Sequence, residues 1–135
     1  MKIAFLGDSI TFGYDTDNHR KQMKKPWVKQ VGDKLNVKEC KNYGVNSASV
    51  MNIPGTKMAA IEEDHKLDED INILVIMIGI NDAYRRYPLG KFSDGTSDTF
   101  YGFLHIMWQR ILKRYPPEKG KKVFLLCILN MMYFG

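Results

Sequence analysis

The sequence predicts a doubly wound α/β sandwich, in which helices cover both faces of a parallel sheet. Three observations support this fold class: short apolar runs stop abruptly, segments of helical periodicity separate them, and the connections are long enough for parallel crossovers. With 135 residues, of which 44% are hydrophobic and 26% charged, the chain can bury one core. We therefore expect a single domain over residues 1–135.

The first half of the chain alternates strands with helical segments. Met1–Leu6 is an apolar run ended by glycine, which is typical of a strand buried on both faces. A helix is expected to begin near Pro26, and a weaker strand to follow over Val37–Asn42. The expected apolar face of that helix comprises Trp27, Val28, Val31 and Leu35. Ser47–Ile61 is expected to be helical in two pieces, broken at Pro54–Gly55.

The second half of the chain repeats the alternation. The acidic run Glu62–Asp70 is most simply a solvated helix end and loop, and Ile71–Ile78 is the clearest buried strand. After a loop over residues 84–97, Asp98–Tyr115 carries a broad apolar stripe at helical spacing. Lys122–Leu129 is then expected to form another buried strand.

Three short polar segments follow predicted strands directly. They read GDS (Gly7–Ser9), NYG (Asn42–Gly44) and GIND (Gly79–Asp82). In open parallel sheets, ligands bind beyond the carboxyl ends of the strands, where the strand order reverses. If the first strand lies between the second and the third, these three strand ends converge on one crevice.

Convergence would give each residue a chemical task. Ser9 would supply a hydroxyl nucleophile. Its own N–H, that of Gly44 and the carboxamide of Asn81 could surround a developing oxyanion, as donors fixed before the charge appears. The alternative for Ser9 is a turn serine that caps a helix.

Neighbouring polar residues are secondary candidates. Asp8, Asn46 and Asp82 could bind substrate, although the two acids more readily bond backbone N–H groups around the site, and a turn role for Asn46 is equally acceptable. Three further loop residues could line the acyl or leaving-group side, but the simpler interpretation is exposure to solvent. They are Tyr14, Tyr84 and Arg85.

These segments together resemble the SGNH-hydrolase (GDSL-type esterase/lipase) family. GDSIT resembles its first block with the nucleophilic Ser9, NYGVNS its second block with the oxyanion Gly44, and GIND its third block with Asn81. The resemblance covers essentially the whole chain. It implies a flavodoxin-like sheet of order beginning 2-1-3-4 and acyl transfer from an ester to water, with no metal or cofactor. The implied substrate is a small-molecule ester or an acetylated carbohydrate.

The sequence departs from that family in two places. Ser47 stands where the second block often has a further glycine, and the Asp-x-x-His pattern that supplies the family's base does not occur. We therefore expect a C-terminally truncated or frame-shifted hydrolase that is impaired in turnover. The three histidines are read as surface residues, with His19 the nearest to the crevice. The others are His65 and His105. The alternative is a non-catalytic fragment or pseudoenzyme that binds acyl or acetylated ligands.

Composition argues against several other classes. The net charge of +5 comes from scattered lysines without interleaved aromatics, which is typical of a solvated face and not of a nucleic-acid site. The longest apolar stretch, Ile71–Ile80, is too short to span a membrane. Neither phosphate-binding glycine motif follows a strand, and the two cysteines lack metal-ligand spacing. We expect a cytoplasmic protein, and the sequence makes no prediction of its oligomeric state.

Overall fold

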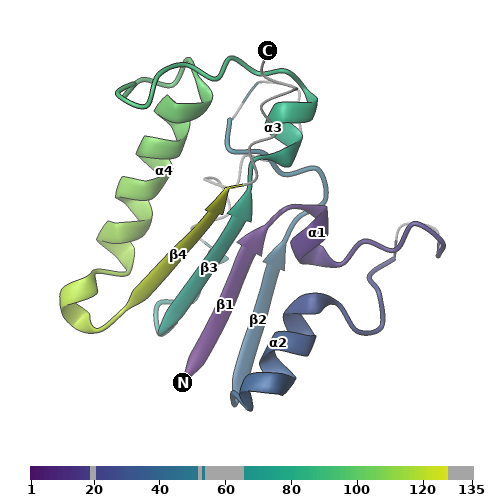
Figure 1. Cartoon of the computed structure of the whole chain (residues 1–135). Helices are drawn as coiled ribbons and strands as arrows, with labels where there is room; N and C mark the ends of the chain where they lie inside the picture. Colours follow the sequence, from purple (N-terminus) through teal and green to yellow (C-terminus); the bar gives the residue numbers. More distant parts are fainter. Residues whose placement is uncertain (19–20, 52, 54–65, 128–135) are drawn as a thin grey trace.

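The computed structural model describes residues 1–18, 21–51, 53 and 66–127. In these ranges four parallel strands form one sheet of order β2-β1-β3-β4 (Figure 1). The strands are β1 (Lys2–Gly7), β2 (Glu39–Gly44), β3 (Ile73–Ile78) and β4 (Lys122–Cys127). The helices are α1 (Ser9–Phe12), α2 (Trp27–Leu35), α3 (Ile80–Tyr84) and α4 (Phe100–Arg114), with a 3₁₀ turn at Pro117–Lys119. The predicted fold class and strand order are confirmed.

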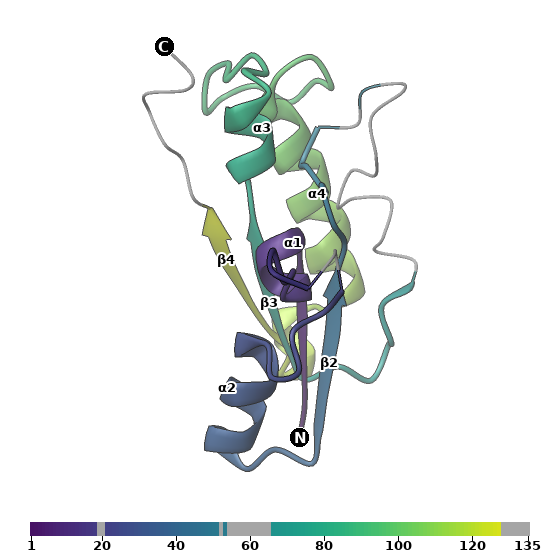
Figure 2. The ribbon, with the colours of Figure 1, turned by 90° about the vertical axis from the view of Figure 1, so that its right-hand side faces the viewer.

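Helices α2 and α4 lie on opposite faces of the sheet (Figure 2). Alternate residues of β1 serve the two layers, because successive side chains of a strand point to opposite faces. Ile3 and Phe5 pack with α2, whereas Ala4 and Leu6 join the larger cluster on the α4 side. That larger cluster includes fully buried side chains from α4, namely Phe100, Met107 and Ile111.

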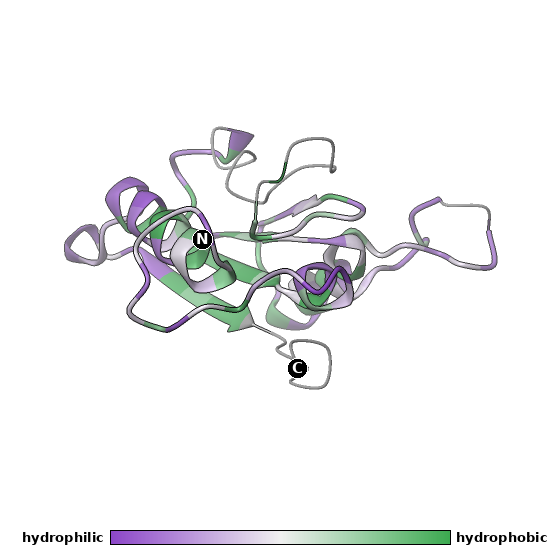
Figure 3. Ribbon diagram, turned by 90° about the horizontal axis from the view of Figure 1, so that it is seen from above, coloured by the Kyte–Doolittle hydropathy of each residue, from purple (hydrophilic) through white to green (hydrophobic). Residues whose placement is uncertain are grey.

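Coverage of the α2 face is uneven. Helix α2 packs on β1 and β2, and on the same face the β4 side chains of Phe124 and Leu126 remain 51% and 50% exposed. Strands β1, β3 and β4 are nevertheless mainly apolar along their length, whereas β2 carries Glu39, Lys41 and Asn42 (Figure 3). Leu35 was expected on the apolar face of α2 but is 58% exposed. It is the last residue of the helix, which ends at the left-handed C-cap Asn36.

One predicted helix is wrong, and two short helices were not predicted. Residues 47–51 are irregular, with a turn at Ser47, a bridge at Ser49 and bends at Val50 and Met51, and not a helix, while residue 52 and residues 54–61 lie outside the described residues. The predicted strand Lys122–Leu129 is described only to Cys127. The sequence analysis also missed the short helices α1 and α3, which follow β1 and β3 immediately.

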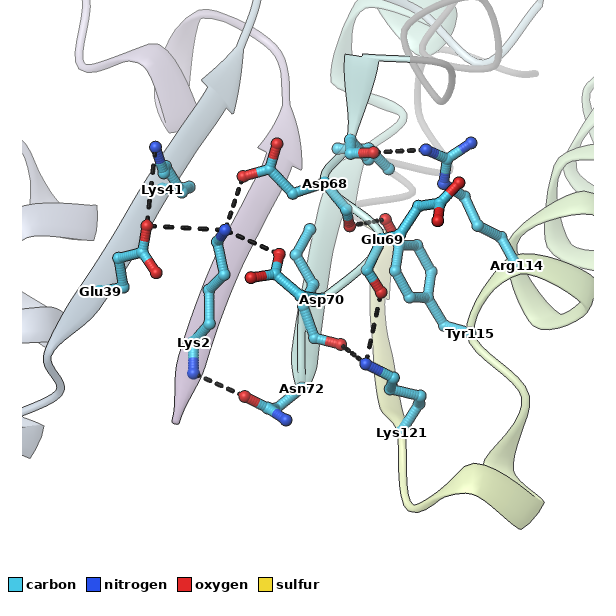
Figure 4. Close-up of polar contacts among 12 residues, drawn as sticks. Lys2, Glu39, Lys41, Asp68, Glu69, Asp70, Asn72, Arg114, Tyr115 and Lys121 are labelled. Atoms are coloured by element: carbon cyan, nitrogen blue, oxygen red, sulfur yellow. Dashed lines mark hydrogen bonds and ion pairs between the residues drawn. The ribbon is translucent and has the colours of Figure 1, made fainter.

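The amino end of the sheet is closed by an ion cluster around Lys2 (Figure 4). The Lys2 ammonium lies 2.7 Å from a carboxylate oxygen of Asp68, 2.8 Å from one of Asp70 and 3.5 Å from one of Glu39. The Lys2 backbone N–H also donates to the side chain of Asn72 at 2.7 Å. The acidic run is therefore not merely solvated, because part of it ties the loop before β3 to β1 and β2.

The carboxyl ends of the first three strands lie level. Gly7, the last residue of β1, pairs in register with Gly44 at the end of β2 and with Met77 near the end of β3. Since β1 lies between β2 and β3, the segments that follow these strands emerge along one edge of the sheet. This edge is where the sequence analysis expects the crevice.

Candidate active site

Ser9 is the first residue of α1 and follows β1 after a single residue. That intervening residue, Asp8, is the N-cap, and its carboxylate accepts the N–H of Ile10 at 2.9 Å. The alternative that Ser9 itself caps a helix is therefore wrong. With Asp8 in the capping role, the half-buried Ser9 side chain has no hydrogen-bond partner within the described part of the chain, and the same holds for its backbone N–H.

Gly44 lies directly under the backbone of α1. A Cβ at this position would lie 2.1 Å from the backbone nitrogen of Phe12, so only glycine lets α1 pack on the end of β2. The side chain of Asn42 links the same two elements. Its amide donates to the Thr11 carbonyl at 2.8 Å, and its oxygen accepts the Gly44 N–H at 2.8 Å. Gly44 must therefore exchange this partner before its N–H can serve an oxyanion.

The turn after Gly44 contains a strained residue. Ser47 has φ 68°, a left-handed conformation that glycine adopts freely and that costs other residues about 1–2 kcal/mol. Serine thus preserves the backbone shape at the position where the resembling family often has glycine. The N–H groups of Asn46 and Ser47 have no acceptor among the described residues, so this turn offers donors besides that of Gly44.

Two side chains of α3 and one from its C-cap residue hold this turn and the residues that follow it. Asn81 donates to the Ala48 carbonyl at 2.8 Å and Arg85 to the Ser47 carbonyl at 2.9 Å. The Asp82 carboxylate accepts the N–H groups of Val50 and Met51, both at 2.9 Å. An amide carries two hydrogens, so Asn81 keeps one for a substrate. The sequence did not reveal the role of Arg85, which was expected on an exposed loop but is half-buried and bonds this turn.

The two acids at the site are both buried. Asp8 is 1% and Asp82 0% exposed, and both accept backbone N–H groups, as predicted from the sequence. Burial raises the pKa of Asp8, and it raises the pKa of Asp82 to about 6, against the opposing effect of the N–H groups that the carboxylate accepts. Asn46 is half-buried, and its carboxamide oxygen has no partner among the described residues.

The described residues contain no histidine near Ser9. His105 is exposed on α4, while His19 and His65 lie outside the described residues. The structure also has, within the ranges that it describes, no group of three or more His, Cys, Asp or Glu side chains suited to a metal ion. None of its described helices is long and apolar enough to cross a bilayer. The arrangement therefore offers a hydroxyl with nearby N–H donors.

Comparison with known proteins adds a family and a fold. The sequence model of the GDSL-like lipase/acylhydrolase family matches residues 5–134, whereas no curated protein matches the chain. A Bacteroides ovatus protein assigned as a GDSL-like lipase superposes with a TM-score of 0.75 at 22% identity, over 98% of this chain and 75% of its own. A Lactobacillus plantarum protein gives 0.76 at 22% identity, over 95% of this chain and 56% of its own.

A third solved structure is nearly matched in length. Est24, a carbohydrate acetylesterase from Sinorhizobium meliloti, gives a TM-score of 0.53 at 11% identity, over 98% of this chain and 93% of its own. Sequence identities this low show a common fold only. The chain spans 56% of the Lactobacillus plantarum protein and 56% of a further structure that superposes with a TM-score of 0.81.

Proposed function

Because the chain belongs to the GDSL-like lipase/acylhydrolase family, we propose that its carboxyl-edge site is that of a serine ester hydrolase with Ser9 as the nucleophile. The observation that carries this proposal is the position of Ser9. It stands at the start of α1, one residue beyond the central strand β1, with its side chain unpartnered among the described residues. A hydroxyl held there can meet a ligand that enters over the ends of three strands.

In the proposed reaction the Ser9 oxygen attacks an ester carbonyl, and the carbonyl oxygen becomes negatively charged. The N–H of Ser9 and the second amide hydrogen of Asn81 would donate to that oxyanion, and Gly44 would join them once its N–H leaves Asn42. The Ser9 proton passes through water or an added base to the departing alkoxide as its C–O bond breaks, which gives an acyl-serine and an alcohol. A water molecule then cleaves the acyl-serine to release the acid and restore the hydroxyl. Asn46 would contact the substrate, whereas the buried Asp8 and Asp82 would keep the surrounding turns in place.

The substrate class follows the family. We propose a small-molecule ester or an acetylated carbohydrate, the latter being the kind of substrate for which the structural neighbour Est24 is named. No metal or cofactor has a part in this reaction.

The base sets the rate of the proposed reaction. A serine hydroxyl is a weak nucleophile at neutral pH unless a neighbouring group accepts its proton. The sequence has no Asp-x-x-His pattern, so we propose that this chain turns esters over slowly. The alternative for a chain without that pattern is a module that binds acyl or acetylated ligands without hydrolysing them, and family membership favours the hydrolase over it.

Chemical rescue tests the proposal. Hydrolysis of p-nitrophenyl acetate is measured for the chain, for Ser9→Ala and for the exposed-loop control Ser97→Ala, with and without imidazole as an external base. We expect slow hydrolysis that imidazole accelerates in the chain and in Ser97→Ala, beyond its background reaction. The Ser9→Ala variant should show only that background. Without imidazole, the chain should hydrolyse the ester about 10³–10⁴ times faster than water does, which is the acceleration left in a site that lacks its base.

The same assay separates the alternatives. Equal rates for the chain and Ser9→Ala under every condition would overturn the hydrolase proposal and leave the binding module. If the chain turned the ester over at about 10 s⁻¹ without imidazole, as an ordinary enzyme does, the proposed impairment would be wrong.

A further inference from the structure

A hollow of about 360 Å³ opens beside Ser9 on the α2 side. Its lining comes from α1, from the connection between α1 and α2, and from the first turn of α2. Apolar side chains form the walls, namely Ile10, Tyr14, Met23 and Trp27. Ser9, Lys25 and Gln30 contribute the polar part of the lining, and Gly13 completes it.

The walls of the hollow are held in place by hydrogen bonds that do not involve a ligand. The Trp27 indole N–H donates to the Ile10 carbonyl at 2.9 Å, which fixes the indole against α1. The Met23 N–H donates to the Gly13 carbonyl at 2.8 Å, next to a bridge between Tyr14 and Gln22. A cavity whose walls are already ordered loses little entropy when it is filled.

Two of the wall residues expose much apolar surface. Ile10 is 44% and Met23 45% exposed, although they lie on different segments and face one hollow. Single exposed apolar residues need no explanation, but two that share a hollow with a candidate nucleophile are a binding surface. Covering them with an apolar group would release water from both side chains.

The charged residue at the hollow does not favour an anion. The Lys25 ammonium lies 3.3 Å from a carboxylate oxygen of Asp33, so its charge already has a partner. The neutral Gln30 amide donates to the Lys25 carbonyl at 3.0 Å, so it too has a partner within the protein. The occupant that fits these walls is therefore apolar.

We propose that this hollow, which we call the Ile10–Met23–Trp27 hollow, binds the acyl chain of the ester that Ser9 attacks. This inference rests on the proposed function and extends it to specificity, since Ser9 belongs both to the site and to the lining. The volume lies at the small end of the about 300–1,000 Å³ typical of ligand pockets. The hollow therefore selects short straight acyl chains over those of long-chain lipids.

The test measures binding without turnover. In Ser9→Ala with Trp108→Phe, Trp27 is the one remaining tryptophan, and its fluorescence is titrated with methyl acetate, butyrate, hexanoate and dodecanoate. We expect a saturable emission change, with an affinity that rises about threefold to fourfold per added methylene while the chain still fits. Beyond that length the affinity should stop rising.

A matched pair of variants localises the effect. Met23→Gln keeps the length of the side chain and adds polarity, so the Kd for methyl hexanoate should rise about fivefold to tenfold. Phe92→Ala removes an apolar side chain that is 86% exposed elsewhere on the surface, and it should leave this Kd unchanged. Circular dichroism of both variants confirms that they are folded.

The outcomes distinguish this inference from the proposed function. Absence of a saturable Trp27 response to every ester, or an equal response in Met23→Gln, would overturn the acyl-binding role. Either result would stand even if the chain hydrolyses p-nitrophenyl acetate through Ser9. Conversely, length-dependent binding in the Ser9→Ala background would support the hollow even if the imidazole assay overturned the hydrolase.

Discussion

The two ends of the sheet use the same residue type in opposite ways. At the amino end, Asp68 and Asp70 are partly exposed and pair with the Lys2 ammonium, which lowers the pKa of both carboxyls. At the carboxyl end, Asp8 and Asp82 are buried and bond neutral N–H groups, and burial raises the pKa of both. An ion pair favours the charged form of a carboxyl group, whereas burial disfavours it, and at Asp82 burial outweighs both the bonded N–H groups and the nearby Arg85 guanidinium.

The two ends therefore have different roles: the amino end stabilises the sheet, and the carboxyl end carries the candidate active site. The cluster around Lys2 joins β1, β2 and the loop before β3 through side chains that satisfy one another. At the other end, the side chains of Asn42, Asn81 and Asp82 form hydrogen bonds with backbone groups of helix α1 and of the loop after β2. The Ser9 side chain and several backbone N–H groups have no hydrogen-bond partner among the described residues. Changes at the carboxyl end should therefore affect the site and stability together, and changes at the amino end stability alone.

The largest effect should follow from Gly44→Ala. The new methyl group would meet the α1 backbone at Phe12, and a helix backbone cannot move aside as a flexible side chain can. We expect the free energy of unfolding to fall by about 1–3 kcal/mol or more, as is usual for overpacking, and the Ser9-dependent hydrolysis to be lost.

Urea denaturation and the imidazole assay check this prediction. Gly95→Ala is the matched control, because a Cβ there meets nothing within 4 Å. If Gly44→Ala were as stable and as active as Gly95→Ala, the close packing of α1 on β2 would not be what positions Ser9.

Asp82→Asn should have an intermediate effect that depends on pH. The folded-state pKa of about 6 lies above the ordinary value of 3.8, so the folded protein holds a proton that the unfolded chain releases. The stability contribution of Asp82 is therefore fully present below pH 3.8 and lost as the pH rises through about 6. The loss amounts to at most about 3 kcal/mol, and Asp82→Asn should abolish it.

Urea denaturation of the parent and Asp82→Asn at several values between pH 4 and pH 7 measures this difference. Asp94→Asn is the control of opposite sign, because the Lys91 N–H and the Thr99 hydroxyl lower the pKa of Asp94. Its contribution is lost as the pH falls. Parallel pH profiles for the parent and Asp82→Asn would contradict the predicted role of burial.

The smallest effect should come from Lys2→Met. Its carboxylate partners Asp68 and Asp70 are 40% and 72% exposed at the side chain, so water screens their repulsion once the ammonium is gone. We expect a lower Tm at neutral pH with unchanged Ser9-dependent hydrolysis. Because Lys2 lowers the pKa of both acids, this stability difference should shrink as the pH falls through those lowered values.

Differential scanning calorimetry and the ester assay at neutral and acidic pH test the Lys2 prediction. A drop in hydrolysis without a drop in Tm would show that the two ends of the sheet are coupled.

The strands could be predicted from the sequence, because apolar runs and the glycines that end them are local signals, whereas the strand order that aligns their carboxyl ends was implied only by the family resemblance. Sequence reasoning missed α1 and α3, since helices of four and five residues are too short to show a period. It also placed a helix over residues 47–51, where Asp82, more than thirty positions later in the sequence, holds the backbone in turns. The contact of Asn42 with Thr11, 31 positions apart, is equally non-local.

The left-handed backbone at Ser47 also restricts how this turn can evolve. Glycine would relax it and asparagine would fit it, whereas β-branched residues such as valine, isoleucine and threonine would meet the largest steric penalty. Because Arg85 holds the Ser47 carbonyl from outside, the turn can keep its shape with a residue that does not favour it. The position is thus open to a narrow set of side chains, and each of them would bring a different polarity to the rim of the site.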